Sequence, residues 1–246
     1  MKRTVAVTDC RISDEAESSL RRLGFDILTL PSFSALPEAI AAHTDMLLCP
    51  LGDELISVAD YCDAAPHVFT DLVALLGTRG MRVAFTDDRL TKEYPYDCRL
   101  NVLTMGEHLF ARLDTVSPYI IKKAEGLGLH TVDIRQGYPA CTVLKLDDTH
   151  AITADKGMAR AMRSVGITVC EICDGGISLP PYEYGFIGGC AGVHGGAVYF
   201  NGELNTHPDA EKIIAFCNEC GLRTVSLCDG VMLDVGGILF IDYDLY

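Results

Sequence analysis

Apolar and polar positions along the chain follow a pattern that recurs five times: an amphipathic helical stretch, a glycine and a short apolar run. Glycine takes the left-handed conformation without steric cost, so each of these glycines is expected to end a helix. The repetition, at spacings of 56, 48, 38 and 55 residues, predicts an internal repeat. The five glycines are Gly24, Gly80, Gly128, Gly166 and Gly221.

A pair of apolar stretches joined by a turn precedes four of these units. Each pair is typical of a β-hairpin, because Gly-Asp, Gly-Glu, Asp-Asp and Gly-Gly at the centres favour tight turns. The repeated unit is therefore strand, turn, strand, helix, glycine, strand, which we write as ββαβ. The four pairs span residues 46–58, 100–110, 141–153 and 192–200.

The two ends of the chain supply the halves of a fifth hairpin. Residues 4–8 form one apolar strand before the first helix, and residues 236–241 form a lone strand at the end. Pairing of these strands closes a ring and removes an exposed sheet edge. We therefore predict a single domain over residues 1–246, an α/β fold in which five ββαβ repeats form a five-bladed α/β-propeller with pseudo-fivefold symmetry. A doubly wound parallel sheet is the main alternative, but it expects single strands to alternate with helices.

The composition is that of a folded chain and limits its partners. Of the 246 residues, 49% are apolar and 22% are charged, which is enough for a core. The net charge is −14, whereas nucleic acids and anionic membranes are bound by basic patches. No run of 18 apolar residues is present, and the N-terminal apolar stretch is too short for a secretory signal. We expect a cytoplasmic protein with no nucleic-acid or membrane partner, and we also consider a homodimer.

The eleven cysteines lie mostly in apolar strand and helix patterns. In a cytoplasmic chain this placement indicates small buried side chains rather than disulfides. Cys170 with Cys173, and Cys217 with Cys220, have the two-residue gap of zinc knuckles, but zinc ribbons place such pairs in loops. We expect no metal and no cofactor.

Polar residues stand at the entrance of the first strand of several units. In a closed ring these positions converge on one axis, and converging polar groups in a concavity indicate a ligand site. The alternative is that they only cap turns. His43 stands at the same kind of position, and the tyrosine- and proline-rich residues 177–185 are interpreted as a cover over one end of the ring. The set is Asp45, Asp97, Asn101, Gln136, Tyr138, Cys190 and Asp234.

Four motifs in this chain resemble those of an uncharacterised bacterial family of the guanidino-group-modifying-enzyme fold, also called the pentein or amidinotransferase-like fold. The motifs are Tyr94-Pro95-Tyr96-Asp97 through Asn101, Gln136-Gly137-Tyr138 through Cys141, Gly185 through Gly189, and Asp234 through Ile241. The resemblance covers nearly the whole chain. It implies a propeller of five ββαβ units, the fold of arginine deiminases, amidinotransferases and dimethylarginine dimethylaminohydrolases.

Those enzymes use a cysteine nucleophile, a histidine and carboxylates that hold a guanidinium group. His43-Thr44-Asp45 resembles their His-Asp approach to the second unit. The expected acidic pair, however, falls on residues 49–51, the expected histidine near Gln136, and the expected nucleophile near Leu239 or Phe240. The usual catalytic set is therefore absent.

Three functions follow from this reading. We expect the centre to bind a small polar molecule, guanidino or amino-acid-like and cationic, through Asp45, Asp97 and Asp234, with Asn101, Gln136 and Tyr138 directing hydrogen bonds. In the first alternative, Cys190 is a displaced nucleophile that attacks an amidine with help from His43, as a hydrolase or amidinotransferase. In the second, the chain is a non-enzymatic interaction protein.

Overall fold

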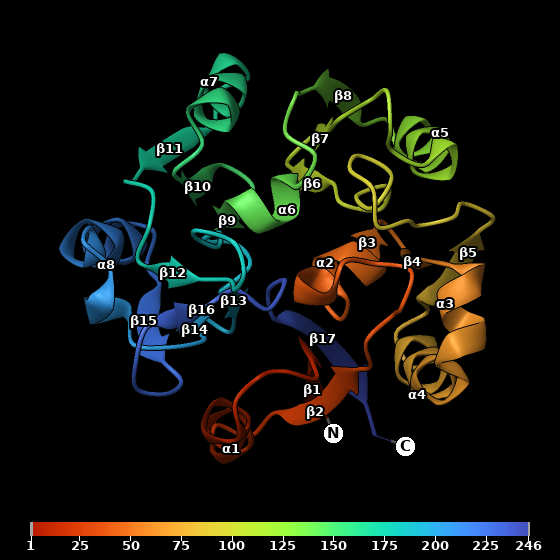
Figure 1. Ribbon diagram of the computed structural model, residues 1–246, viewed down its shortest axis with the longest axis horizontal. Coiled ribbons are helices and arrows are strands. Elements are labelled where there is room, and N and C mark those ends of the chain that lie inside the picture. Colours follow the sequence, from red (N-terminus) through yellow and green to blue (C-terminus); the bar gives the residue numbers. More distant parts are fainter. Residues whose placement is uncertain (1, 246) are drawn as a thin grey trace.

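The computed structural model describes residues 2–245 and has a mixed α/β architecture. Figure 1 shows short sheets and their helices arranged around the middle of the molecule. In chain order the elements are β1 (Lys2–Asp9), α1 (Asp14–Arg22), β2 (Asp26–Leu30), η1 (Glu38–Ile40), α2 (Thr44–Leu47), β3 (Cys49–Leu51), β4 (Glu54–Val58), α3 (Ala59–Ala64), α4 (Pro66–Gly77), β5 (Arg82–Thr86), β6 (Leu103–Met105), β7 (His108–Ala111), α5 (Pro118–Gly126), β8 (His130–Asp133), α6 (Pro139–Thr142), β9 (Val143–Lys145), β10 (His150–Thr153), α7 (Lys156–Ser164), β11 (Thr168–Glu171), β12 (Ile177–Ser178), β13 (Ala191–His194), β14 (Ala197–Phe200), η2 (Leu204–Thr206), α8 (Ala210–Glu219), β15 (Arg223–Ser226), β16 (Met232–Leu233) and β17 (Leu239–Asp244).

The described strands form five three-stranded sheets and one two-stranded sheet. The orders are β17-β1-β2, β3-β4-β5, β6-β7-β8, β9-β10-β11 and β13-β14-β15, with β12 paired to β16. In each three-stranded sheet the middle strand pairs antiparallel with one neighbour and parallel with the other. The four predicted hairpins are confirmed. Five separate mixed sheets exclude the doubly wound parallel sheet, and no described sheet closes on itself.

The two terminal strands pair as predicted. β1 and β17 run antiparallel, with Val5 opposite Ile241 and Val7 opposite Leu239. The first sheet is thus assembled from the two ends of the chain, which lie side by side in Figure 1.

The junction after each repeat helix follows from its sequence, and α7 is an example. Asp155 caps the helix by accepting hydrogen bonds from the backbone amides of Gly157 and Met158. Met158 and Met162, one turn apart, are buried on one face of the helix. Gly166 then turns the chain with a φ of +87°, and the other four repeat glycines also have positive φ values.

The first strand of a repeat begins later than the sequence predicts in three of the four hairpins. The prediction starts strands at residues 46, 100 and 141, whereas β3, β6 and β9 start at 49, 103 and 143. The single-turn helices α2 and α6 occupy two of these entrances. Long-range hydrogen bonds favour both turns: the Asp45 amide donates to the Gly236 carbonyl at 3.2 Å, and the Ala140 amide donates to Asn101 Oδ1 at 2.8 Å. Pro139 also favours α6 locally, because its fixed φ suits the first residue of a helix.

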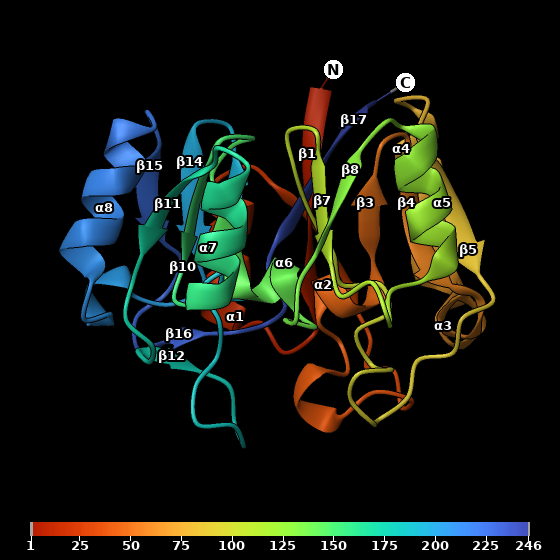
Figure 2. The ribbon, with the colours of Figure 1, turned by 90° about the horizontal axis from the view of Figure 1, so that it is seen from above.

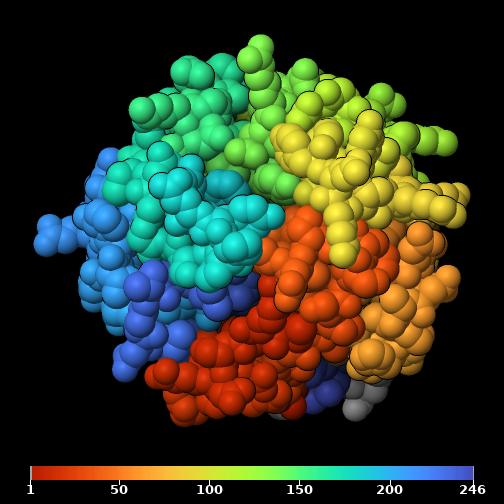
Figure 3. Space-filling model, in the orientation of Figure 1, coloured from red at the N-terminus to blue at the C-terminus, as the bar shows by residue number. Residues whose placement is uncertain are grey.

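The two ends of the molecule differ. Figure 2 shows α2 and α6 at mid-height, the chain termini at one end, and β12 and β16 toward the other. The second end carries the longer loops, and the segment after β12 covers much of its centre (cyan in Figure 3). Among residues 2–245 no helix combines the length and apolarity needed to cross a membrane.

Candidate functional site

The single-turn helices α2 and α6 lie near the middle of Figure 1, and a cavity opens on each side of them. We call the first the loop-side pocket; its volume is about 270 Å³. Its lining residues are Ile40, His43, Met46, Tyr138, Cys141, Leu179, Tyr182, Glu183, Tyr184, Phe186 and Asp234. The second, the inner-strand cavity, has a volume of about 430 Å³ and is lined by residues of β3, β6, β9, β13 and β17 together with Asp45.

Asp234 is the buried carboxylate of the loop-side pocket. It accepts hydrogen bonds from the backbone amides of Phe186 at 2.8 Å and Gly236 at 3.0 Å. Burial raises its pKa to about 6, against the opposing effect of these bonds and of the Arg11 charge. The glycines of the neighbouring chain make room for it, because a Cβ on Gly185 or Gly189 would overlap the Asp234 side chain. Asp234 is ionised at neutral pH and held in one orientation.

His43 lies beside Asp234 and is fully buried. Its Nδ1 is 3.8 Å from Asp234 Oδ1, beyond hydrogen-bond distance, and neither ring nitrogen has a partner. Burial, with the nearby Arg11 charge, lowers the pKa of His43 to about 3. The imidazole is therefore neutral, and its two ring nitrogens are buried without a hydrogen-bond partner.

Asp45 and Cys141 join α2 to α6. The Cys141 thiol donates to Asp45 Oδ2 at 2.5 Å, while Asp45 Oδ1 is buried and has no partner. Burial raises the pKa of Asp45 to about 8; the Asp234 charge adds to this effect and the bonds from Cys141 and Asn101 oppose it. Burial and the Asp45 charge likewise raise the pKa of Cys141 well above its usual value. Near neutral pH both groups therefore hold a proton, whereas an exposed aspartate would be ionised.

Asn101, Tyr138 and Asp97 support the two helices. Asn101 Nδ2 donates to the Asp45 carbonyl at 3.2 Å, and its Oδ1 accepts from the Ala140 amide at 2.8 Å. The Tyr138 hydroxyl, at the pocket, donates to Asp97 Oδ2 at 2.6 Å. Asp97 is buried behind Tyr138, and burial raises its pKa. Of these three side chains, only that of Tyr138 lines a cavity.

Two predicted site residues point elsewhere. Gln136 Nε2 donates to Asp155 at 2.9 Å and its Oε1 accepts from the Tyr138 amide, so Gln136 ties its loop to the start of α7. Cys190 is completely buried in an apolar cluster, where its thiol donates to the Ile187 carbonyl at 3.3 Å. Burial raises the pKa of Cys190 far from that of a reactive thiolate. Neither residue lines the two cavities.

The sequence reasoning missed Cys141 and the aromatic wall of the pocket. Cys141 stands in an apolar run and gives no local signal. Tyr182, Tyr184 and Phe186 come from the Tyr-rich segment that was interpreted only as a cover. The ligand atoms of His43, Asp45 and Cys141 lie within 4.8 Å of one another, a donor set that zinc accepts. The expectation of no metal stays a prediction.

Solved structures similar to this chain include a DDAH, an amidinotransferase and an agmatine deiminase. DDAH from Pseudomonas aeruginosa, a cysteine-to-serine mutant complexed with citrulline, is 12% identical, with a TM-score of 0.54 over 91% of each chain. The amidinotransferase SxtG from Microseira wollei is 12% identical, with a TM-score of 0.52 over 90% of this chain and 78% of that one. The agmatine deiminase of C. jejuni is 8% identical, with a TM-score of 0.51 over 91% of this chain and 86% of that one.

These similarities define the class of the fold: the chain has the architecture of the guanidino-group-modifying, or pentein, proteins. A search of curated protein sequences finds no match. Within the class the chain belongs to the Family of unknown function (DUF6873), whose profile matches residues 7–239.

Proposed function

We propose that this protein binds a small cationic, amino-acid-like or guanidino molecule in the loop-side pocket. The observation that carries the proposal is the composition of its wall. The pocket joins two carboxylates, Asp234 and Glu183, to four Tyr and Phe rings, and none of its described lining residues is Lys or Arg.

The two carboxylates have different roles. Asp234 is fixed by two backbone amides, and an ionised carboxylate has acceptor capacity beyond two bonds. Glu183 is exposed at the mouth, where its charge attracts a cation without a large desolvation cost. Glu183 thus supplies negative charge at the surface, and the fully buried Asp234 supplies it from within the wall.

The aromatic residues add a second source of cation affinity. Tyr182 and Tyr184 are 51% and 38% exposed, so their rings are available to a ligand. A cation over such a ring gains about 0.5–2 kcal/mol, depending on its desolvation. A guanidinium is planar and weakly hydrated, which suits it to aromatic faces as well as carboxylates.

The printed descriptions of the similar structures name citrulline as a bound molecule and agmatine as the object of a deiminase. They support a guanidino compound as the first ligand to test here. This chain lacks the usual residues at the catalytic positions of those enzymes, and their absence favours binding without turnover.

A cysteine-dependent reaction is the second candidate, and the cysteine that supports it is Cys141 rather than Cys190. Cys141 lines the pocket and donates its proton to Asp45, whereas Cys190 lies in the core. Because its pKa is raised, Cys141 acts as a nucleophile only after it loses its proton, and Asp45 can accept that proton only while Asp45 is ionised. Loss of citrulline, urea or ammonia formation in Cys141→Ser, with turnover in the wild type, supports this candidate over binding alone.

We also propose that the five three-stranded sheets are the blades of one closed five-bladed propeller with pseudo-fivefold symmetry, built by a single domain over residues 1–246. Two observations support this interpretation: β1 pairs with β17, and one strand from each of the five sheets lines the same inner-strand cavity. Burial of cysteines such as Cys49 and Cys217 as small core side chains supports a cytoplasmic protein.

Thermal-shift measurements with arginine, agmatine, methylarginines and other amino acids test the ligand. A ligand present at one hundred times its Kd stabilises the fold by about 2.7 kcal/mol, which raises the Tm by several degrees in a chain of this size. We expect Glu183→Gln and Tyr184→Leu to reduce the shift. Glu125→Gln, the same charge change on the exposed surface of α5, is the matched control.

Two results contradict the proposal. One is the absence of any shift at millimolar concentration across the cationic compounds. The other is an equal shift in wild type, Glu183→Gln and Glu125→Gln, which would mean that the compounds act outside this pocket. An interaction protein without a small ligand, the remaining alternative, predicts the first result.

A further inference from the structure

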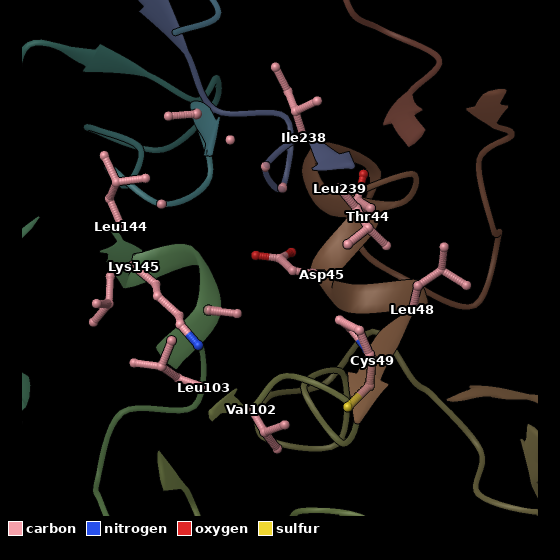
Figure 4. Close-up of a pocket in the computed structure, with 18 of the residues that line it drawn as sticks. Thr44, Asp45, Leu48, Cys49, Val102, Leu103, Leu144, Lys145, Ile238 and Leu239 are labelled. Atoms are coloured by element: carbon pink, nitrogen blue, oxygen red, sulfur yellow. The ribbon is translucent and has the colours of Figure 1, made fainter. Parts of the chain in front are cut away.

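The inner-strand cavity lies on the far side of α2 and α6 from the loop-side pocket and is the larger of the two. Figure 4 shows its wall: Leu48, Val102, Leu103, Leu144 and Ile238 surround an open middle, and the Asp45 carboxylate points into it. Its volume of about 430 Å³ lies within the range of small-molecule sites. The cavity is thus an apolar chamber with one carboxylate in its wall.

The two charged residue types in this wall, Asp45 and Lys145, differ in how far their hydrogen bonds are already satisfied. Lys145 is occupied, because its Nζ donates to the Thr104 carbonyl at 2.9 Å and to Asp148 at 2.7 Å. Asp45 is half occupied: Oδ2 accepts from Cys141, but Oδ1 has no partner. A buried carboxyl group without a charged partner is destabilised, and a ligand cation beside it can recover part of that free energy. Among the described residues of this wall, Asp45 is the carboxyl group without such a partner, and Lys145 has no free charge to offer.

The rest of the wall determines the body of the ligand. The five strands that meet here contribute mainly Leu, Ile, Val, Ala and Gly. A zwitterionic amino acid would have to place a carboxylate against this surface without a charged partner, which is costly. An aliphatic chain gains free energy there for each methylene removed from water.

We propose that the inner-strand cavity is a second ligand site that binds an aliphatic monoamine. Its ammonium group donates to the Asp45 carboxyl group, which releases its proton to solvent as the amine binds, and its hydrocarbon chain lies along the inner strands. This site is separate from the loop-side pocket, where aromatic rings and a second carboxylate suit a more polar cation.

Isothermal titration calorimetry with n-butylamine, n-hexylamine and n-octylamine tests the proposal, with n-hexanol as the uncharged comparison. Each added methylene is expected to tighten binding about three- to fourfold, until the chain exceeds the cavity. We expect n-hexanol to bind at least tenfold more weakly than n-hexylamine, because it lacks the charge-assisted bond. Equal affinity of the amine and the alcohol, or no binding by any amine, overturns the proposal; in the second case the cavity holds water only.

Two variants locate the site. Asp45→Asn keeps the shape of the side chain but cannot ionise to pair with an ammonium group, so it should weaken n-hexylamine binding at least tenfold. Val102→Phe leaves Asp45 in place and fills part of the cavity, so it should weaken n-octylamine more than n-butylamine. Near-ultraviolet circular dichroism checks that each variant is folded, and Val102→Phe carries the test if Asp45→Asn does not fold.

A third variant separates this proposal from the proposed function. Glu183→Gln changes the mouth of the loop-side pocket and should leave n-hexylamine affinity within twofold of the wild type, although it weakens agmatine. Alkylamines that lose affinity in Glu183→Gln but keep it in Asp45→Asn bind in the loop-side pocket, and the second site is then refuted. If the wild type binds alkylamines but does not bind agmatine, only the proposed function of the loop-side pocket is refuted.

Discussion

Asp45 differs from the other carboxylates of the centre in the partners of its two oxygens. One oxygen accepts a hydrogen bond from the Cys141 thiol and the other has no partner. Burial therefore dominates and raises the pKa of Asp45 to about 8. Asp234 is also buried, but two backbone amides stabilise its charge, and its pKa therefore rises only to about 6. The same residue type thus has two protonation states at neutral pH, which the hydrogen-bond partners determine.

This difference predicts how stability changes with pH. Between pH 7 and 8 the folded state holds a proton on Asp45 that the unfolded state, with a pKa of 3.8, has lost. Asp234 (about 6) is mostly deprotonated in both states there. His43 is neutral in the folded state (about 3), while its unfolded pKa of 6.5 gives a smaller slope of opposite sign that fades toward pH 8. Since the folded state binds more protons, the free energy of unfolding should fall as pH rises through this interval, by at most about 1.4 kcal/mol per pH unit.

Urea unfolding at pH 7.0, 7.5 and 8.0 measures this slope. Asp45→Asn has no proton to lose and should flatten it, whereas Glu125→Gln should keep it. A wild-type slope that persists in Asp45→Asn would assign the titration to another group.

Gly236 predicts a second residue-scale effect. Its φ is +71°, and a Cβ there would overlap Cα and Cβ of His43. Gly221, after α8, has a φ of +73° but no atom within 4 Å of an added Cβ. We expect Gly221→Ala to lose about 1–2 kcal/mol from backbone strain alone.

Gly236→Ala should lose that amount and a further 1–3 kcal/mol or more from the steric overlap with His43. Urea unfolding of the two variants compares them directly. Equal losses would mean that His43 moves freely, and would weaken the case for a fixed site geometry.

At the scale of the element, the repeated unit could be predicted because its signals are local. Glycine after an amphipathic stretch and a turn between two apolar runs each depend on a few neighbouring residues. The helices α2 and α6 have only four residues each, and they depend on contacts with distant chain, such as the Asp45 amide with Gly236. The sequence therefore predicted strands where the structure has single turns.

The candidate site could be predicted to a similar extent. The entrance positions of Asp45 and Asp234 were found from the repeat, and both border cavities. The direction of Gln136 depends on Asp155, which is 19 residues away and caps a different element. Cys141 could not be distinguished from a core cysteine, because only its distance to Asp45 makes it unusual.

The cap of α7 gives the prediction at this scale. Asp155 accepts from two helix amides and from Gln136, so Asp155→Ala should lower the free energy of unfolding by about 1–2 kcal/mol. Gln136→Ala should lower it by less and leave ligand binding unchanged. Lys156→Ala, on the exposed start of the same helix, serves as the control in urea unfolding and should change little. Weaker agmatine binding in Gln136→Ala at unchanged stability would restore Gln136 to the binding site.

For the whole molecule, the pairing of β1 with β17 makes the last strand part of the first sheet. Removal of residues 236–246 opens the edge of β1 and uncovers core residues such as Val5 and Val7. We expect this truncation to abolish cooperative folding rather than shorten a tail. Removal of residues 245–246 alone should leave the fold intact.

Circular dichroism and thermal unfolding of the two truncated chains test this prediction. A cooperative transition in the chain that ends at Val235 would show that the first sheet is dispensable.

The short helices α2 and α6 are also a partition. The Cys141 thiol and the Asp45 carboxyl group meet there, but Cys141 borders the loop-side pocket and Asp45 borders the inner-strand cavity. A charged ligand on either side would change the protonation of the Cys141–Asp45 pair. Its electrostatic effect would then extend to the opposite cavity without movement of the backbone. Thermodynamic reciprocity then requires that occupants of the two chambers change each other's affinity by the same factor. The two proposed ligands would therefore be coupled through a single thiol–carboxyl pair, although they would not touch each other.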